Sequence, residues 1–261
     1  MHSIQDPGGD SPTPEAETGN LSPRPSGVLL SRRFLDLIEV VLAAFAGTLF
    51  APLFLEPLGV SVGEALNDSK VLGLFLFADA TCTIGLLWIM QRLRGKNLAS
   101  LGWGRRNRSS ELRIGFQVLP GLILLMFLFS LFFEAFLPDW VTEQNPLLAL
   151  IQSPTDAMIF MAASIYAGGV KEELQRGFII ERFENSLGGA VWGIVVWSLV
   201  FGALHYTQGI DNAIKAGSLG LVLGILYWKR RRLEGPIIAH ALFDVVVVLL
   251  VYLFPELAGT G

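Results

Sequence analysis

Seven apolar runs dominate the chain, at residues 34–55, 70–90, 114–137, 157–181, 190–207, 213–228 and 236–254. Each run is about as long as the helix of about 20 residues that crosses the hydrocarbon core of a bilayer. The runs are continuous, whereas the strands of a membrane barrel alternate apolar and polar residues in segments of about ten residues. The sequence therefore predicts an all-α, polytopic bundle of transmembrane helices with about seven spans.

The composition excludes an ordinary soluble domain. Hydrophobic residues make up 52% of the chain and charged residues 16%, whereas soluble domains carry about 25% charged residues. The single cysteine, Cys82, excludes an internal disulfide framework and a cysteine-based zinc cluster. The net charge of −4 gives no reason to expect a nucleic-acid partner.

The chain divides into a tail and a membrane domain. Residues 1–28 are rich in proline, glycine, serine and acidic residues, which predicts a disordered N-terminal tail. They do not have the basic and apolar regions of a secretory signal peptide. Residues 29–261 are then the transmembrane domain, and an eighth, partial or interfacial helix within residues 95–112 stays open as an alternative.

The distribution of basic residues predicts the orientation, because Lys and Arg accumulate in short cytoplasmic loops. The loop after the second run and the loop after the sixth are strongly basic, at residues 92–113 and 229–232. The intervening loops carry mainly Asp and Glu. We therefore expect a cytoplasmic N-terminus and a C-terminus on the opposite side, in a membrane that we expect to be the bacterial inner membrane, since no organelle signal is visible.

The fourth run contains an unusual group of charged residues, Lys171, Glu172, Glu173 and Arg176. Ionisable residues inside membrane helices are rare and usually face the bundle interior for a functional reason. The alternative is a cytoplasmic helix end, where Glu172 and Arg176, four residues apart, would form a surface ion pair.

Both histidines of the apolar region follow the spacing of one helical turn. His205 lies four residues after Phe201, and His240 lies four residues before Asp244, so each pair shares a helix face. The remaining histidine is His2, in the tail. Packing alone seldom produces two such histidines together with a glutamate pair.

These residue types support hydrolysis in a partly dry cavity. A desolvated carboxylate has a raised proton affinity and can take a proton from water near neutral pH. Glu172 or Glu173 is the expected base, and His205 is expected to hold the water. His240 and Asp244 would complete a site for the oxyanion that forms when water attacks a carbonyl.

Arg176 is expected to orient the two glutamates. No cofactor is expected, but zinc stays open as an alternative, because two histidines and one carboxylate form a common hydrolytic zinc triad, as in a metalloendopeptidase. The histidines lie on separate helices and the His-Glu-x-x-His spacing is absent, which favours the mechanism without metal.

The three motifs together resemble the type II CAAX prenyl endopeptidase and bacteriocin-processing (CPBP) family of intramembrane glutamic proteases. The matching segments are 172–177, 201–205 and 236–244, and the resemblance covers about residues 140–250. It implies an endopeptidase within the membrane that uses a glutamate-activated water and histidines, without an obligatory metal. The expected partners are the lipid bilayer and a lipid-modified or membrane-inserted peptide substrate.

One departure from the family pattern affects the register of the motif. The family usually reads Glu-Glu-x-x-x-Arg, but only Leu174 and Gln175 separate the glutamate pair from Arg176. If the family motif is aligned on Arg176, its two glutamates fall on Lys171 and Glu172. If it is aligned on the glutamate pair, Arg176 is rotated by about 100° around the helix from the position of the family's arginine. Glu172 carries a family glutamate in both registers, so we predict it as the base.

The alternative from another class is a non-catalytic homologue, acting as a membrane binding scaffold or a proton-coupled carrier through the same buried groups.

The two histidines lie at different depths in their predicted helices. At about 1.5 Å of rise per residue, His240 lies roughly 6 Å into its run and His205 roughly 20 Å. To bring them together we expect residues 176–189 to line a cavity, where non-helical backbone is tolerated.

Overall fold

The computed structural model describes residues 26–65, 67–104 and 108–258. These residues are helical apart from short connections, and they contain no strand, so the predicted all-α class is confirmed. The predicted tail lies outside the described residues up to residue 25, and the first helix begins at Ser26.

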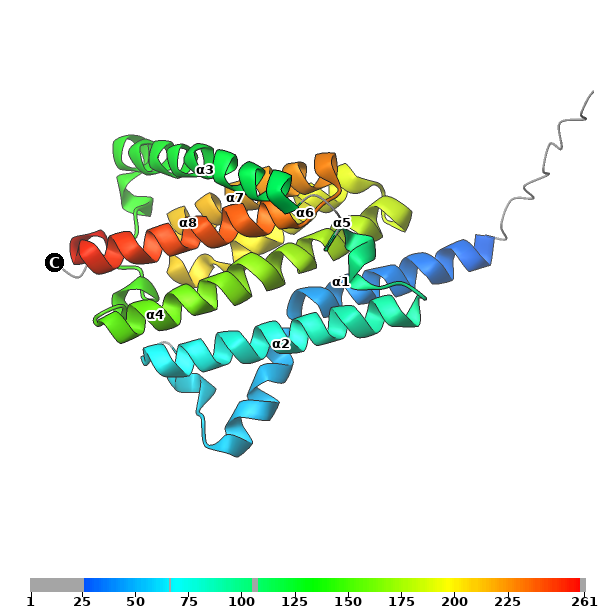
Figure 1. The fold of residues 1–261 in the computed structure, drawn as a ribbon, viewed down its shortest axis with the longest axis horizontal. Helices are drawn as coiled ribbons and strands as arrows, with labels where there is room; N and C mark the ends of the chain where they lie inside the picture. The colour runs from blue at the N-terminus through cyan, green and yellow to red at the C-terminus, as the bar shows by residue number, and fades with distance from the viewer. Residues whose placement is uncertain (1–25, 66, 105–107, 259–261) are drawn as a thin grey trace, which may run out of the picture.

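The described part of the chain has eight α-helices, which form seven rods (Figure 1), because a π-helical segment, Ser164–Glu172, joins α4 to α5 without a break. The rods correspond to the seven apolar runs of the sequence. The connection that was open to an eighth helix has one 3-10 turn, Leu98–Leu101, within its described part. The helices are α1 Ser26–Leu55, α2 Ser69–Leu93, α3 Arg108–Phe136, α4 Pro154–Ala163, α5 Glu173–Ser186, α6 Ala190–Leu204, α7 Ile210–Arg230 and α8 Glu234–Leu253.

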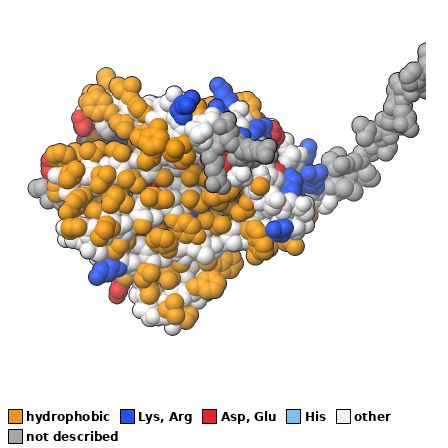
Figure 2. All heavy atoms as spheres, viewed as in Figure 1, with side chains coloured by type: hydrophobic (Ala, Val, Ile, Leu, Met, Phe, Trp, Pro, Cys, Tyr) orange, Lys and Arg blue, Asp and Glu red, His pale blue; other side chains and the backbone are white. Residues whose placement is uncertain are grey.

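The outer surface is apolar enough for lipid. Five of the described helices, α1, α2, α3, α7 and α8, have the length and composition needed to cross a membrane. Large apolar side chains such as Phe34, Leu49 and Phe127 are exposed, and hydrophobic side chains cover most of the face seen in Figure 2. A soluble monomer rarely exposes so much contiguous apolar surface. The protein is therefore an integral membrane protein.

Successive rods run in opposite directions, so the connections gather at two ends of the bundle (Figure 1). The basic end carries the connections 94–104, 187–189 and 231–233, and most Lys and Arg side chains visible in Figure 2 lie toward it. The opposite end carries the connections 56–65, 137–153 and 205–209. The basic and the acidic connections that the sequence distinguished thus lie at opposite ends of the folded bundle.

The half of the bundle near the basic end is tightly packed. In α5 the apolar side chains of Leu174, Phe178, Ile179 and Ile180 are all buried. They belong to one cluster with Trp197 of α6 and with residues of α2 and α7. Close packing of this kind leaves few voids larger than a water molecule.

A buried ion network ties α1, α2 and α5 together at the same end. Arg182 is 1% exposed, and its guanidinium donates to Glu39 (2.6 Å), Gln91 (2.8 Å) and Glu181 (3.1 Å). Asp36, fully buried one turn from Glu39, forms an ion pair with Arg94 and accepts a hydrogen bond from Ser186. Because every charge in this network has a partner of opposite sign, its burial is tolerated.

Removing one member of a buried ion network leaves the others uncompensated. We predict that Arg182→Ala lowers the free energy of unfolding by about 3–5 kcal/mol. The measurement is thermal unfolding of the purified protein in detergent. The matched control is Arg33→Ala, which removes the same charge from an exposed position on α1. Equal melting temperatures for the two variants would show that the network does not stabilise the fold.

The fourth rod begins with a capping box at the opposite end. Ser153 is the N-cap of α4: its hydroxyl accepts from the Asp156 amide (3.2 Å) and donates to the Asp156 carboxylate (2.7 Å). The hydroxyl of Ser69 in α2 donates to the same carboxylate (2.5 Å). These hydrogen bonds, that from Ser69 foremost, lower the pKa of Asp156, since they favour the charged carboxylate.

Because the pKa of Asp156 is lower in the folded than in the unfolded chain, its contribution to stability is present above the unfolded pKa of about 4. It is lost as the pH falls through the folded pKa. We predict that Asp156→Asn lowers the melting temperature at pH 7 more than at pH 3. A difference between variant and wild type that does not change with pH would contradict this linkage.

Candidate active site

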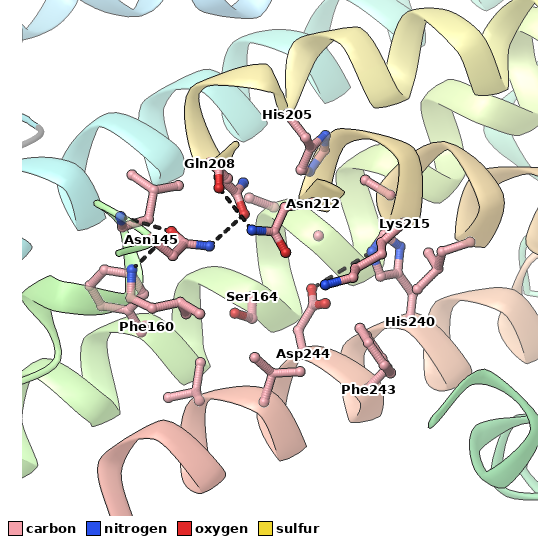
Figure 3. Close-up of a pocket in the computed structure, with 18 of the residues that line it drawn as sticks. Asn145, Phe160, Ser164, His205, Gln208, Asn212, Lys215, His240, Phe243 and Asp244 are labelled. Atoms are coloured by element: carbon pink, nitrogen blue, oxygen red, sulfur yellow. Dashed lines mark hydrogen bonds and ion pairs between the residues drawn. The ribbon is translucent and has the colours of Figure 1, made fainter. Parts of the chain in front are cut away.

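A pocket of about 410 Å³ lies between the rods in the half of the bundle near the opposite end (Figure 3). Four of the six predicted site residues line it: Glu172, His205, His240 and Asp244. They come from the π-helical segment, the end of α6 and the middle of α8. Glu173 and Arg176 lie behind this wall rather than in it.

His240 is at the centre of the charged groups. Its Nδ1 lies 2.8 Å from Glu173 Oε1, and its Nε2 lies 3.9 Å from Glu172 Oε2 and 3.7 Å from Asp244 Oδ2. An ionised carboxylate only accepts hydrogen bonds, so Nδ1 donates to Glu173. In the neutral ring Nε2 then carries the lone pair, between the carboxylates of Glu172 and Asp244.

The second glutamate has a structural position. Glu173 is fully buried, and its Oε1 accepts a hydrogen bond from Arg176 Nη1 as well as from His240. Arg176 is 1% exposed, and its guanidinium lies 5.1 Å from the centre of the Phe201 ring. The arginine therefore neutralises Glu173, and Glu173 in turn fixes the ring of His240.

The first glutamate faces the pocket and has a different cation beside it. Lys171 Nζ lies 3.4 Å from Glu172 Oε1 and 3.1 Å from Asp79 Oδ2 of α2. Asp79 also accepts a hydrogen bond from Thr48 of α1 (3.0 Å). Lys171 is thus held toward α2, and the Glu172 carboxylate keeps access to the pocket.

Phe201 connects the two histidines. Its ring centre lies 4.5 Å from that of His205 and 6.2 Å from that of His240. The backbone carbonyl of Phe201 accepts a hydrogen bond from His205 Nδ1 (2.8 Å), which leaves Nε2 of His205 available. The histidines therefore line one pocket despite their different depths.

The expectation that residues 176–189 line a cavity is wrong. Most of this stretch is α5, a regular helix whose side chains from Gly177 to Ile180 are buried in the packed half of the bundle. No extra depth is needed, because the pocket itself extends along the helix axes from His240 to the end of α6.

Two features of the site were not singled out from the sequence. A side chain at Gly168 would collide with the carboxylate of Asp244, and one at Gly169 would lie 2.7 Å from Ala241 Cβ. These glycines let α8 approach the π-helical segment closely enough to place His240 and Asp244 beside Glu172. The signal in the sequence was the Gly-Gly pair, which only Val170 separates from the charged group.

The second feature is a polar rim, formed by Asn145, Gln208 and Asn212 at the opposite end of the pocket (Figure 3). Asn145 Nδ2 donates to Gln208 Oε1 (3.4 Å), and Asn212 Nδ2 donates to the Gln208 carbonyl (2.8 Å). Nothing in helical periodicity marks these amides, because two of them lie in the connections between helices.

The described residues contain no group of three His, Cys, Asp or Glu side chains placed to hold a metal ion.

The comparisons with known proteins find a family for the part of the chain that forms this pocket. The model of the family described as type II CAAX prenyl endopeptidase Rce1-like matches residues 153–246. Residues 153–246 are similar to the Rce1-like family. No curated protein and no solved structure matches the chain. The matched stretch begins at the N-cap of α4 and ends two residues after Asp244, so it includes all six predicted site residues.

Glu172 and Glu173 should respond differently to the same substitution. Glu173→Gln removes the partner of the buried Arg176, and we expect a loss of about 3–5 kcal/mol in the free energy of unfolding. Glu172→Gln changes a pocket-facing group and should leave the melting temperature near that of wild type. Thermal unfolding in detergent measures both. A larger loss for Glu172→Gln would contradict the assigned positions.

Proposed function

We propose that this protein is an intramembrane endopeptidase in which Glu172 activates water to hydrolyse a peptide bond of a lipid-modified or membrane-inserted substrate. The observation that carries the proposal is the position of the Glu172 carboxylate. It faces a pocket inside a membrane bundle, 3.9 Å from a histidine whose other nitrogen is fixed by a buried glutamate. The Rce1-like match supports a peptidase of this kind.

The chemistry begins with a water molecule against Glu172. Its oxygen attacks the carbonyl carbon of the peptide bond while the carboxylate takes its proton. The carbonyl oxygen becomes an oxyanion, and an imidazole N–H directed at it stabilises that charge. Nε2 of His240 can donate in this way when the ring carries its second proton, with Asp244 at 3.7 Å to stabilise the cation.

The second half of the reaction returns the enzyme to its starting state. The C–N bond breaks as Glu172 passes its proton to the leaving nitrogen, which gives an amine and a carboxylic acid. His205 lies at the end of α6, with its ring against Phe201 and Nε2 free to hold the attacking water. In this proposal Arg176 does not touch the substrate and acts through Glu173, so it is a positioning residue.

The apolar wall of the pocket supports the substrate class. It includes Leu72, Met126, Phe160, Phe243 and Val248, from four different helices. Such a wall binds a lipid chain or apolar side chains by removing them from contact with water. A peptide without an apolar group would gain little from this surface.

The test is cleavage of a panel of quenched fluorescent lipopeptides by the purified protein in detergent. We predict that wild type cleaves at least one member and that Glu172→Gln and His205→Ala lower kcat by about 10²–10⁴-fold, the usual contribution of a general base. Glu184→Gln is the matched control, because Glu184 lies on α5 and is paired with Arg231, away from the pocket.

Each outcome discriminates among the candidates. Cleavage that persists in a strong chelator supports the glutamate-activated water, and cleavage abolished by the chelator and restored by zinc would replace it with a metal-dependent mechanism. No cleavage of any member by wild type would contradict the proposal and favour a non-catalytic scaffold or carrier. Equal loss in Glu184→Gln would show that the effect is not specific to the pocket.

A further inference from the structure

The pocket is placed asymmetrically along the membrane normal. Its lining on α2 and α7 comes from the first turns, and its lining on α6 from the last turn, and all of these lie toward the opposite end. The lining on the fourth rod comes from α4 and the π-helical segment and stops at Glu172, where the buried side chains of α5 begin. The lining on α8 runs from His240 to Val248, through the middle of that helix, so the pocket extends from the middle of the bundle toward the opposite end.

The half near the basic end offers no comparable route to Glu172. The buried apolar side chains of α5 fill the space below the carboxylate, from Leu174 to Phe183. Beyond them lies the ion network of Arg182, Glu39 and Gln91, which ties α5 to α1 and α2. A substrate entering from the basic end would have to separate this network and the packed cluster.

The charge distribution indicates which side of the membrane each end faces. The basic end carries Arg94, Lys96, Arg230 and Arg231 among its described residues, and the connections at the opposite end carry mainly Asp and Glu. Loops rich in Lys and Arg stay in the cytoplasm. The packed half then lies in the cytoplasmic half of the bilayer, and the pocket extends from the middle of the bilayer into the other half.

We infer that substrates reach Glu172 from the non-cytoplasmic side of the membrane, as peptides anchored by an apolar group in the outer half of the bilayer. The part of this inference that concerns cleavage rests on the proposed function. The side from which the pocket is reached does not depend on it. It narrows the substrate class to lipid-modified or membrane-anchored peptides whose scissile bond lies on the side opposite the basic loops.

The polar rim fits the peptide part of such a substrate. Asn145, Gln208 and Asn212 carry amide groups that both donate and accept hydrogen bonds, as a peptide backbone requires. Asn145 and Gln208 belong to the connections at the opposite end and Asn212 to the first turn of α7, and all three line the pocket (Figure 3). A peptide crossing the rim would present its backbone to these amides while its anchor stays against the apolar wall.

The side of access is tested by thiol labelling of the full chain in bacterial spheroplasts. All variants carry Cys82→Ala, which removes the single native thiol. Thr207→Cys reports the opposite end, Ala99→Cys the basic end, and Ser164→Cys the pocket wall. A small, charged, membrane-impermeant methanethiosulfonate is applied to intact and to permeabilised spheroplasts.

We expect the thiols at positions 207 and 164 to be modified in intact spheroplasts, and the thiol at position 99 to be modified only after permeabilisation. Excess lipopeptide substrate should slow modification at position 164 several-fold without changing that at position 207. Modification at position 99 in intact spheroplasts, or at position 164 only after permeabilisation, would overturn the inference.

A second measurement links access to turnover. In sealed proteoliposomes the same labels give the fraction of molecules with each end outward, and a lipopeptide is added outside. Cleavage should follow the fraction with residue 207 outward; cleavage that follows the fraction with residue 99 outward would overturn the inference. Failure of wild type to cleave in detergent contradicts the proposed function, while the labelling at position 164 still decides the side of access.

Discussion

The buried group of Glu173, Arg176 and His240 holds the site together. Arg176 and Glu173 are almost completely excluded from solvent, so each would be costly alone and is tolerable only because the other is present. Glu173 Oε1 contacts both Arg176 and Nδ1 of His240, so the same carboxylate fixes the ring of the histidine. The orientation of α8 relative to the fourth rod therefore depends on an ion pair within a single helix.

This arrangement separates the tasks of two adjacent carboxylates. Successive residues of an α-helix point about 100° apart, so Glu172 and Glu173 cannot face the same surroundings. One is enclosed with a fully buried cation and organises the neighbouring helix, and the other faces a pocket with a partly buried lysine beside it. Two chemically identical side chains thus acquire different environments from one step along the backbone.

The sequence predicted the parts of the fold that depend on hydropathy. The seven apolar runs correspond to the seven rods. This is because the need to keep apolar residues in lipid or in the core determines where each helix begins and ends. It also predicted His205, His240 and Asp244 as site residues, because ionisable groups in apolar helices are rare and are usually functional. The structure lines one pocket with all three together with Glu172.

Other features depend on contacts that no local pattern encodes. The sequence did not single out Gly168 as a point of close approach. A side chain there would collide with Asp244, which is 76 residues away on another helix. The amides of Asn145 and Gln208 meet across two loops. The depth argument for the histidines was misleading because it treated each helix as starting at the same plane and ignored the ring of Phe201, which reaches both.

The shortened spacing between the glutamate pair and Arg176 has a structural counterpart. Removing one residue from a helix turns everything on one side of the gap by about 100° relative to the other. The pair Glu173 and Arg176 remains on one face of the helix, because residues three apart are also neighbours on a helix surface.

Directly before the pair lies the π-helical segment, whose i→i+5 hydrogen bonds take one more residue per turn than an α-helix. A wider turn reduces the rotation per residue, so it changes the phase of α4 relative to α5. The segment ends at Glu172, which places the carboxylate at the boundary between the two phases. The phase of α5 is set by Arg176 and the packed core, and that of α4 by the wall of the pocket. Glu172 and Glu173 face different surroundings because successive residues point about 100° apart, and the boundary between the two phases falls between them.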